Sequence, residues 1–345
     1  MSADKTPRTE VSSLGEFGLI DHLTSSIKLT QPTTVLGVGD DAAVISAGDR
    51  LMLLSTDLFL EGIHFDLVYN PLAHLGYKTV VNSIMDIYAM NGTPTQITVA
   101  VGLSKKFSVE MLDQLYSGIK LACEHYDVDF VGGDTSSSYT GLTLSTSVVG
   151  WVDKDSIAYR SGAKENDLIC VTGNLGAAFM GLQILEREKR LYTDQNIAKT
   201  NLDGYEYIIQ RQLKPEARRD MVELLKSLGI KPTSMIDISD GLASEILHIC
   251  KSSKVGARIY LDKLPIASQT FKAAEEMNFD PVVAALNGGE DAELLFTVPI
   301  ELHDQLKNLG GIDVVGHITA ESKGAFLVTP DGSEVLIQAQ GWTKQ

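Results

Sequence analysis

The sequence predicts an α/β protein with two domains, and three observations support this prediction. The chain has 345 residues, which is more than one hydrophobic core usually holds. Its composition, 44% hydrophobic with 30 glycines, is typical of a globular protein. Short apolar runs alternate with segments whose apolar residues recur at helical spacing, as in layered folds of strands and helices.

The first half of the chain predicts one sheet backed by two helices. The first helix starts at Asn70-Pro71 and stops at Asn91-Gly92, because Asn and Pro favour helix starts and Asn-Gly favours helix ends. Ser108 caps the second helix. Short apolar runs and alternating apolar residues predict strands at 35–36, 51–54, 96–103, 129–131 and 142–152.

The second half predicts a separate α/β unit that begins near 152–162. We divide the chain into a flexible, polar start (1–13), an N-terminal domain (14–155) and a C-terminal α/β domain (156–345). Strands are expected at 168–172, 235–238, 256–261, 293–298, 312–317, 325–329 and 334–338. Helices are expected at 177–190, 203–212, 216–228, 241–252, 267–277 and 299–309.

Charge and composition exclude several classes of partner. Lys and Arg number 29 against 45 Asp and Glu, a net charge of −16, which argues against nucleic acid or an anionic membrane. Residues 1–13 lack the apolar core of a signal peptide, and no apolar run approaches the roughly 18 residues that span a bilayer. The three cysteines are widely spaced, without zinc or redox spacing. We therefore expect a cytoplasmic protein.

Acidic residues gather where apolar runs stop. Asp40-Asp41 follows Val35-Leu36 in Gly37–Ala43, and the run 51–54 leads into Ser55-Thr56-Asp57. Further acids in turns or small-residue settings are Asp86, Asp134, Asp237, Asp240, Glu290 and Asp291. Two carboxylates ~4 Å apart repel by about 4 kcal/mol at an effective dielectric of 20, so a convergent set favours bound Mg²⁺ and phosphate. Spacing alone leaves open that the acids are scattered caps and turns.

Other nucleotide-binding motifs fit poorly. Gly37-x-Gly39-x-x-Ala42 matches a dinucleotide fingerprint in spacing, but that motif needs a helix next, and here a turn and a strand are expected. No Walker lysine and no protein-kinase catalytic set occurs. A lone histidine such as His64 more often has a structural role than a functional one, and Trp342 is an unusual residue so near the end of a chain.

Seven motifs in order carry a resemblance to a known family. They are Gly-Glu-Phe-Gly-Leu-Ile (15–20), Gly-Val-Gly-Asp-Asp-Ala-Ala (37–43), Ser-Thr-Asp-x4-Gly-Ile-His-Phe-Asp (55–66), Gly-Gly-Asp-Thr (132–135), Met-Ile-Asp-Ile-Ser-Asp-Gly-Leu (235–242), Gly-Gly-Glu-Asp-x-Glu-Leu-Leu-Phe-Thr (288–297) and Gly-Trp (341–342). Together they resemble the thiamine-monophosphate kinase family, within the superfamily that includes aminoimidazole ribonucleotide synthetase. The resemblance spans nearly the whole chain.

The resemblance implies the fold and the reaction. It implies an aminoimidazole ribonucleotide synthetase-like fold whose N-terminal sheet forms a dimer barrel, with a C-terminal α/β domain closing the cleft. It implies a homodimer that phosphorylates thiamine monophosphate to the diphosphate with ATP, by direct transfer and with several Mg²⁺ ions.

The resemblance also implies residue roles. The metal set would be Asp41, Ser55, Thr56, Asp57, Asp86, Asp134, Asp237 and Asp240, of which Asp41, Asp57, Asp86 and Asp240 would be catalytic. ATP contacts would be Tyr116, Gly133, Asp134, Arg160 and Ser239. Substrate contacts would be His64, Glu290 and Trp342.

Three positions depart from the family pattern. Met85 replaces the usual Ser before Asp86, Ala292 replaces a Tyr, and Thr343-Lys344-Gln345 replaces a His-Phe ending. Three alternatives to the kinase therefore stay open: a related ATP-using cyclo-ligase, a metal-dependent phosphatase, and a non-catalytic nucleotide-binding paralogue.

Overall fold

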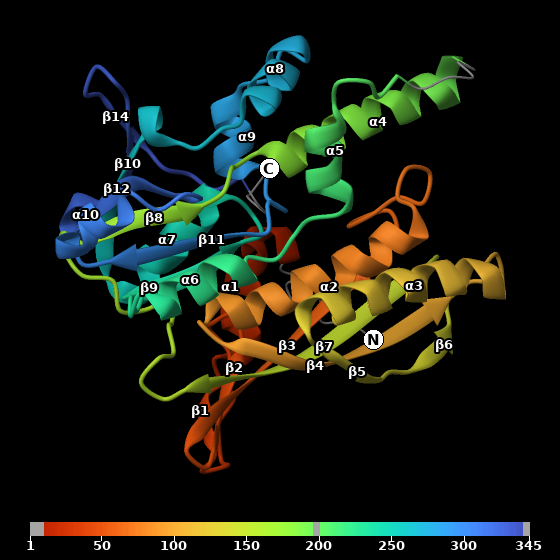
Figure 1. Cartoon of the computed structure of the whole chain (residues 1–345), viewed down its shortest axis with the longest axis horizontal. Helices are drawn as coiled ribbons and strands as arrows, with labels where there is room; N and C mark the ends of the chain where they lie inside the picture. The colour runs from red at the N-terminus through yellow and green to blue at the C-terminus, as the bar shows by residue number, and fades with distance from the viewer. Residues whose placement is uncertain (1–9, 196–200, 341–345) are drawn as a thin grey trace, which may run out of the picture.

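The chain folds around two sheets, one from each half of the sequence. The structure is a computed structural model that describes residues 10–195 and 201–340. Within these residues each sheet has seven strands. In Figure 1 the N-terminal sheet and its helices α2 and α3 form the lower part of the molecule, and the C-terminal sheet and its helices form the upper part. The predicted α/β fold class is confirmed, whereas the dimer barrel remains a prediction.

The N-terminal sheet is built on three long antiparallel strands. Its order is β1-β2-β3-β7-β4-β5, and β6 also pairs with β4. β3 pairs with β7 along its whole length, from Arg50 opposite Asp153 to Leu60 opposite Thr143. The strands are β1 (Thr34–Leu36), β2 (Ala43–Ala47), β3 (Arg50–Leu60), β4 (Thr93–Leu103), β5 (Asp129–Gly132), β6 (Thr135–Ser137) and β7 (Thr143–Asp153).

Two helices, α2 (Leu72–Ala89) and α3 (Val109–Tyr126), cover one face of this sheet. They cross closely because each has a glycine at the contact: a Cβ on Gly118 would lie 1.8 Å from the Ala73 carbonyl oxygen. Strand side chains alternate between faces, so Leu53 is buried beneath the helices while its neighbour Leu54 is 38% exposed on the other face. That outer face has no covering element from the described part of this chain.

The C-terminal sheet has the order β14-β13-β10-β12-β8-β11-β9. Every residue of β8 and β11 is buried, as expected for central strands covered on both faces. The strands are β8 (Leu168–Thr172), β9 (Ser234–Ile238), β10 (Val255–Tyr260), β11 (Glu293–Val298), β12 (Ile312–Ala320), β13 (Ala325–Val328) and β14 (Glu334–Leu336).

Seven helices accompany this sheet in the described residues. α4 and α5 pack as a pair, and α7 runs directly from the end of β9. The helices are α4 (Ala177–Gln195), α5 (Glu206–Leu213), α6 (Arg219–Ser227), α7 (Leu242–Ser253), α8 (Ser268–Glu276), α9 (Pro281–Asn287) and α10 (His303–Leu306).

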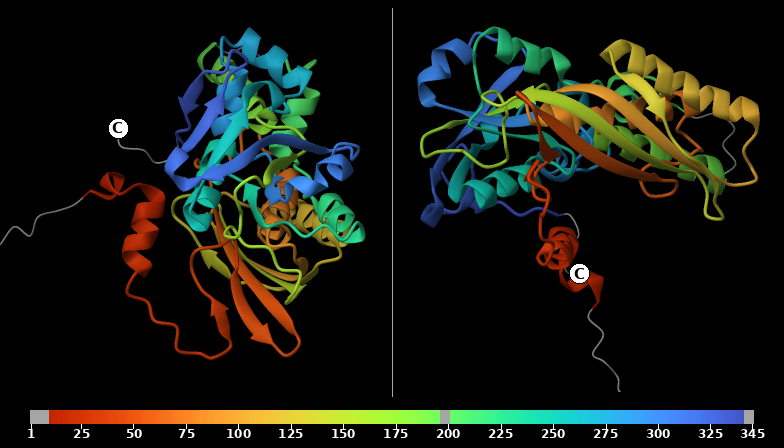
Figure 2. Two further views of the ribbon diagram at one scale, coloured as in Figure 1. Left: turned by 90° about the vertical axis from the view of Figure 1, so that its left-hand side faces the viewer. Right: turned by 90° about the horizontal axis from the view of Figure 1, so that it is seen from below.

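The first helix, α1 (Gly15–Thr24), stands at the side of the body (Figure 2). The Phe17 ring packs edge-on against His248 of α7 with centroids 4.0 Å apart, and Asp21 pairs with Lys251 at 2.9 Å. Leu23 at its end is 62% exposed. Two side-chain contacts therefore account for much of its attachment.

Several predicted boundaries were wrong. β3 runs on to Leu60, so Asp57 lies inside a strand and not at its end, because full pairing with β7 holds the backbone extended there. The expected helix at 299–309 is only a 3₁₀ turn (Ile300–Leu302) followed by one turn of α10. α1, β2, β6 and α9 were not predicted. In the described ranges each helix is too short or too polar to cross a bilayer.

Candidate active site

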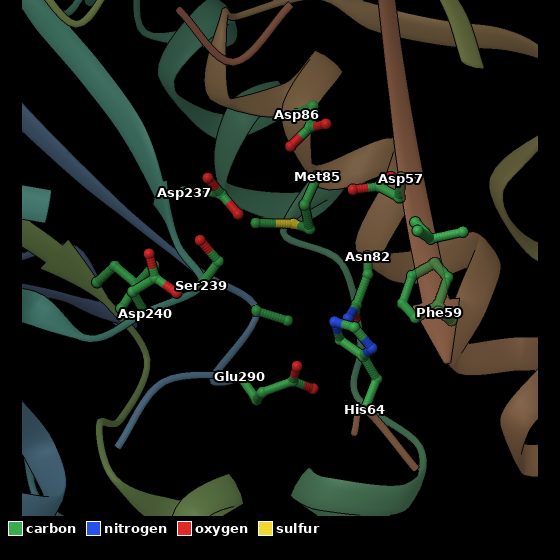
Figure 3. Close-up of a pocket in the computed structure, with 13 residues that line it drawn as sticks. Asp57, Phe59, His64, Asn82, Met85, Asp86, Asp237, Ser239, Asp240 and Glu290 are labelled. Carbon is green, nitrogen blue, oxygen red and sulfur yellow. The ribbon is translucent and has the colours of Figure 1, made fainter. Parts of the chain in front are cut away.

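A pocket of about 220 Å³ lies where the two sheets approach each other. One wall comes from β3 and α2, and the other from the end of β9 and the loop before β11. Figure 3 shows the acidic side chains around the pocket and His64 across from Glu290. Its lining includes six of the predicted site residues with charged or titratable side chains: Asp57, His64, Asp86, Asp237, Asp240 and Glu290.

β3 turns alternate residues toward this pocket. Ser55 and Asp57 share the face that meets α2 because side chains two apart in a strand point the same way. Ser55 Oγ donates a hydrogen bond to Asp86 Oδ2 of α2. Thr56 lies on the opposite face, where its hydroxyl donates to the Thr146 carbonyl oxygen at 2.6 Å. The structure therefore joins Ser55, Asp57 and Asp86, but not the Thr56 side chain.

The turn between β1 and β2 supplies Asp41, which is 8% exposed. Arg160 Nη2 donates to Asp41 Oδ1 at 2.5 Å, and the Arg160 backbone N–H donates to Asp40 Oδ2 at 3.2 Å. Burial and the neighbouring Asp41 raise the pKa of Asp40 to about 7. Arg160 thus lies among the acids, as expected for a residue that meets phosphate charge, and Asp40 is an acid of this turn that the predicted metal set did not include.

The end of β9 supplies Asp237, Ser239 and Asp240. The Asp240 backbone N–H donates to Glu245 Oε1 at 2.9 Å, and Glu245 is 2% exposed at the start of α7. The Ser239 carbonyl oxygen accepts the backbone N–H of Glu290 at 2.8 Å. The end of the strand is therefore tied to both the following helix and the opposite loop.

Five carboxylates, which we call the acid cluster, perturb one another: Asp41, Asp57, Asp86, Asp237 and Asp240. Burial, then the charges of Asp57 and Asp237, raise the pKa of Asp86 well above its usual value. Burial, then the charge of Asp41, do the same to the pKa of Asp237. Burial followed by the Glu290 charge raises the pKa of Asp240. Such mutual repulsion shows that the predicted acids converge.

The acid cluster fits a bound cation. Asp41 Oδ2 and Asp57 Oδ2 are buried and have no hydrogen-bond partner among the described residues. Carboxylate oxygens of this kind are ligands that Mg²⁺ prefers. Within the described ranges, no three or more acidic, His or Cys side chains already form a ready metal cage, and Mg²⁺ commonly takes only one or two carboxylates beside water and substrate phosphates.

On the side of the pocket formed by His64, one hydrogen-bond donor can be assigned to a specific atom. The Leu60 backbone N–H donates to His64 Nδ1 at 3.1 Å, so this nitrogen carries no proton and Nε2 is the N–H donor. His64 and Asp240 also border a larger hollow of about 760 Å³, whose apolar lining includes Leu14, Phe17, Ile63 and Leu247. The acidic pocket and the apolar hollow therefore share residues.

The loop Gly288–Ala292 presents Glu290 in a strained backbone. Glu290 has φ +61° and Ala292 has φ +53°, conformations that cost non-glycine residues about 1 kcal/mol or more. Asp291 anchors the loop by accepting the backbone N–H of Gly176 at 2.7 Å. Arg211 Nη2 donates to the Asp291 carbonyl oxygen at 2.6 Å. The surroundings thus fix Glu290 in a place that its own backbone preference would not choose.

Behind this loop lies a second group of buried charges, the arginine cluster (Arg211, Arg218, Asp291 and Glu293). Arg211 Nη2 lies 2.8 Å and Arg218 Nε 3.4 Å from Glu293. Thr172 Oγ1 also donates to Glu293 at 2.5 Å. Glu293 is 1% exposed. Opposite charges are therefore matched here.

Three predicted ATP contacts, Tyr116, Gly133 and Asp134, lie elsewhere in the N-terminal half. Asp134 immediately precedes β6, which is separated from Asp57 on β3 by β7 and β4, about 14 Å at the usual strand spacing. Asp134 is exposed. A Cβ on Gly133 would lie 1.9 Å from the Val99 carbonyl oxygen. Tyr116 on α3 packs against Phe130. None of the three lines the pocket, and Trp342 lies outside the described residues.

Some pocket residues were missed by sequence reasoning. Asn82 and Phe59 line the pocket, and Asn82 had a usable signal because it lies one helical turn before Asp86. Met85, the departure noted above, is 1% exposed and also lines the pocket. Its Sδ accepts the backbone N–H of Arg218 at 3.4 Å. Met85 therefore fills space between the two halves beside Asp86.

Comparison with known proteins agrees with this geometry. Residues 39–152 match the family model "AIR synthase related protein, N-terminal domain", and residues 164–329 match its C-terminal counterpart. The chain is 33% identical over 332 residues to a thiamine-monophosphate kinase of Aquifex aeolicus, covering 96% of this chain and 98% of that one. It is 33% identical over 350 residues to the thiamine-monophosphate kinase of Escherichia coli K12, covering 95% and 97%.

A solved structure described as AaThiL complexed with AMPPCP and TMP matches with a TM-score of 0.83 at 31% identity, covering 97% of this chain and 98% of that chain. The family models thus cover most of the chain, and the full-length relatives cover nearly all of it. The chain belongs to the thiamine-monophosphate kinase family of AIR synthase-related proteins.

Proposed function

We propose that this protein is a kinase that transfers the terminal phosphate of ATP directly to thiamine monophosphate, giving thiamine diphosphate. One observation carries the proposal: the acidic pocket lies directly beside an apolar hollow, and the two share His64 and Asp240. A phosphate acceptor with an aromatic ring system needs both environments next to each other. The relative solved with AMPPCP and TMP supports the same pairing of ligands.

The acid cluster (Asp41, Asp57, Asp86, Asp237 and Asp240), together with Ser55, would hold Mg²⁺. Bound Mg²⁺ supplies positive charge that neutralises the phosphate oxygens during transfer. The proposed ligands Thr56 and Asp134, and the proposed ATP contacts Tyr116 and Gly133, would have to act from outside the pocket in this arrangement.

The chain's own residues would bind and orient the two substrates. Arg160 offers a planar guanidinium that suits phosphate, and it is held among the acids by Asp40 and Asp41. His64 donates from Nε2, and Glu290 accepts, from opposite sides of the pocket.

We further propose a homodimer formed through the N-terminal sheet. On its outer face Met52 lies opposite Trp151, and Leu54 opposite Val149, while Leu58 is 52% exposed. Exposed apolar side chains of this kind on an uncovered sheet face are typical of an interface. Light scattering of the purified protein at micromolar concentration should give twice the mass of the chain, and a monomer would count against the interface.

The domain division at 155–156 is part of the proposal. It is supported by the family models, which end at 152 and restart at 164. A cytoplasmic location is supported by three unpaired, buried cysteines among the described residues, since reducing compartments keep thiols free.

One assay tests the function. Purified protein is incubated with ATP, Mg²⁺ and thiamine monophosphate, and the products are separated by chromatography. The kinase predicts equal amounts of ADP and thiamine diphosphate. Free phosphate without thiamine diphosphate would favour a phosphatase, ADP and phosphate formed only with another acceptor would favour a cyclo-ligase, and nucleotide binding without turnover would favour a non-catalytic paralogue.

A further inference from the structure

A buried lysine links the two walls of the pocket. Lys78 of α2 is 3% exposed, and its Nζ lies 2.6 Å from Glu290 Oε2 in the opposite loop. Lysine is almost never this buried unless it is paired. The pair joins the N-terminal half of the molecule to the C-terminal half at the acceptor end of the pocket.

Helix geometry places this lysine on the functional face of α2. Lys78, Asn82 and Asp86 are four residues apart, so they follow one another along one side of the helix. Asn82 and Asp86 line the pocket. Lys78 is therefore the basic member of the row that faces the loop Gly288–Ala292.

The lysine opposes a repulsion that acts on Glu290. The Glu290 charge contributes to raising the pKa of Asp57 and the pKa of Asp240, after the larger effect of burial. The Glu290 side chain is 34% exposed, so solvent offers it an alternative to staying near two other carboxylates. The backbone of Glu290 is fixed by its contact with Ser239, which leaves the side chain as the part that can move away.

The pair does not belong to a larger structural network. Apart from their ion pair with each other, neither Lys78 Nζ nor Glu290 Oε2 has a hydrogen-bond partner in the described part of the chain. A purely structural buried lysine would be expected to satisfy more of its three N–H donors. By contrast, each arginine of the arginine cluster contacts Glu293 together with another group.

We propose that Lys78 is a positioning residue for the acceptor: it holds the Glu290 carboxylate over the pocket against the repulsion of Asp57 and Asp240. This inference rests on the proposed function, because Glu290 is the group that would meet thiamine monophosphate. Lys78 acts through Glu290 and needs no contact with either substrate.

A double-mutant cycle tests the inference. Lys78→Met, Glu290→Gln and the double variant are compared by steady-state kinetics with each substrate varied in turn. We expect Lys78→Met to lower kcat/KM for thiamine monophosphate by roughly 10- to 100-fold, the range for outer-shell partners. The KM for ATP should change by less than about threefold, since distant sites couple weakly. In the Glu290→Gln background Lys78→Met should have little further effect, because the neutral amide is not repelled.

Lys231→Met is the matched control, since the Lys231 ammonium donates to the Asp155 carbonyl oxygen at 2.6 Å at the far end of the same domain junction. It should leave both kinetic constants unchanged. Losses that multiply in the double variant, or a Lys78→Met enzyme as active as wild type, would overturn the inference.

If Lys78→Met melts below the assay temperature, Lys78→Arg takes its place, because it keeps the charge but changes the reach. Its loss, too, should vanish in the Glu290→Gln background, and persistence of the loss there would refute the positioning role. A wild-type enzyme that makes no thiamine diphosphate refutes the proposed function instead. In that case calorimetric titration of thiamine monophosphate into the same variants tests Lys78 alone: weaker binding supports the role, and unchanged binding refutes it.

Discussion

Two groups of charges lie close together in this molecule, and they are built in opposite ways. In the arginine cluster Glu293 meets two guanidinium groups and a hydroxyl. In the acid cluster carboxylates face carboxylates, and Arg160 forms an ion pair with Asp41 alone of the five. The paired charges of the arginine cluster hold a loop in place, whereas the unpaired carboxylates of the acid cluster can bind cations. Whether a charged group is paired with an opposite charge therefore distinguishes the structural group from the functional one here.

The largest expected effect comes from unpairing the arginine cluster. Glu293→Gln keeps the shape of the side chain but leaves Arg211 and Arg218 buried without their carboxylate. We expect a loss of about 3–5 kcal/mol in the free energy of unfolding, measured by urea denaturation. Glu223→Gln is the control, because Glu223 pairs with Arg219 at 2.7 Å on the surface, where such a pair contributes roughly 0–1 kcal/mol. Equal losses in the two variants would remove the contrast between the clusters.

The next effect should appear in activity and not in stability. Asp57→Asn removes one charge from the acid cluster, so repulsion falls and the metal-free protein should be as stable as wild type or more stable. Turnover at limiting Mg²⁺ should fall by about 100-fold or more, because a ligand is lost. Asp41→Asn should behave in the same way. Near-normal turnover at limiting Mg²⁺ in either variant would contradict the metal assignment.

The smallest effect concerns the acceptor ring. Trp342 lies outside the described residues, and its role as a contact to the substrate's ring system stays a prediction from the family resemblance. A cation against an indole face is worth ~0.5–2 kcal/mol, so Trp342→Ala should raise the KM for thiamine monophosphate by roughly two- to thirtyfold. The KM for ATP should stay nearly constant. A variant that melts earlier yet keeps both constants would mean that Trp342 only secures the end of the chain.

The sequence was most informative where local chemistry is unusual. Asp41, Asp237 and Asp240 could be found because acids beside glycine or serine at the ends of apolar runs are uncommon. Alternation along β3 had the information to separate Thr56 from Ser55 and Asp57, but the strand was predicted too short to use it. Lys78 and Glu245 could not be found in this way, because on a helix they look like ordinary surface charges.

Contact between segments far apart in the chain hides Lys78 from sequence reasoning, because Lys78 meets a loop more than two hundred residues away. Glu245 accepts a hydrogen bond from the nearby Asp240 backbone, and the charge of Asp41, which lies far earlier in the chain, is among those that raise its pKa. Met85 could be recognised as a departure from the family, yet its contact with Arg218 depends on how the two halves meet. Pairings of this range leave no periodic signal in the sequence.

The position of α1 has a consequence for hydrogen exchange. This helix contacts the body mainly through the Phe17–His248 and Asp21–Lys251 pairs, while α2 is buried along most of its length. Segments with few buried contacts open at low free energy, whereas core helices exchange only on near-global unfolding. Deuterium should therefore enter the amides of 15–24 well before those of 72–89. Because Phe17 borders the apolar hollow beside His64, a ligand that fills the hollow should slow exchange in α1 first, so that this helix reports acceptor binding.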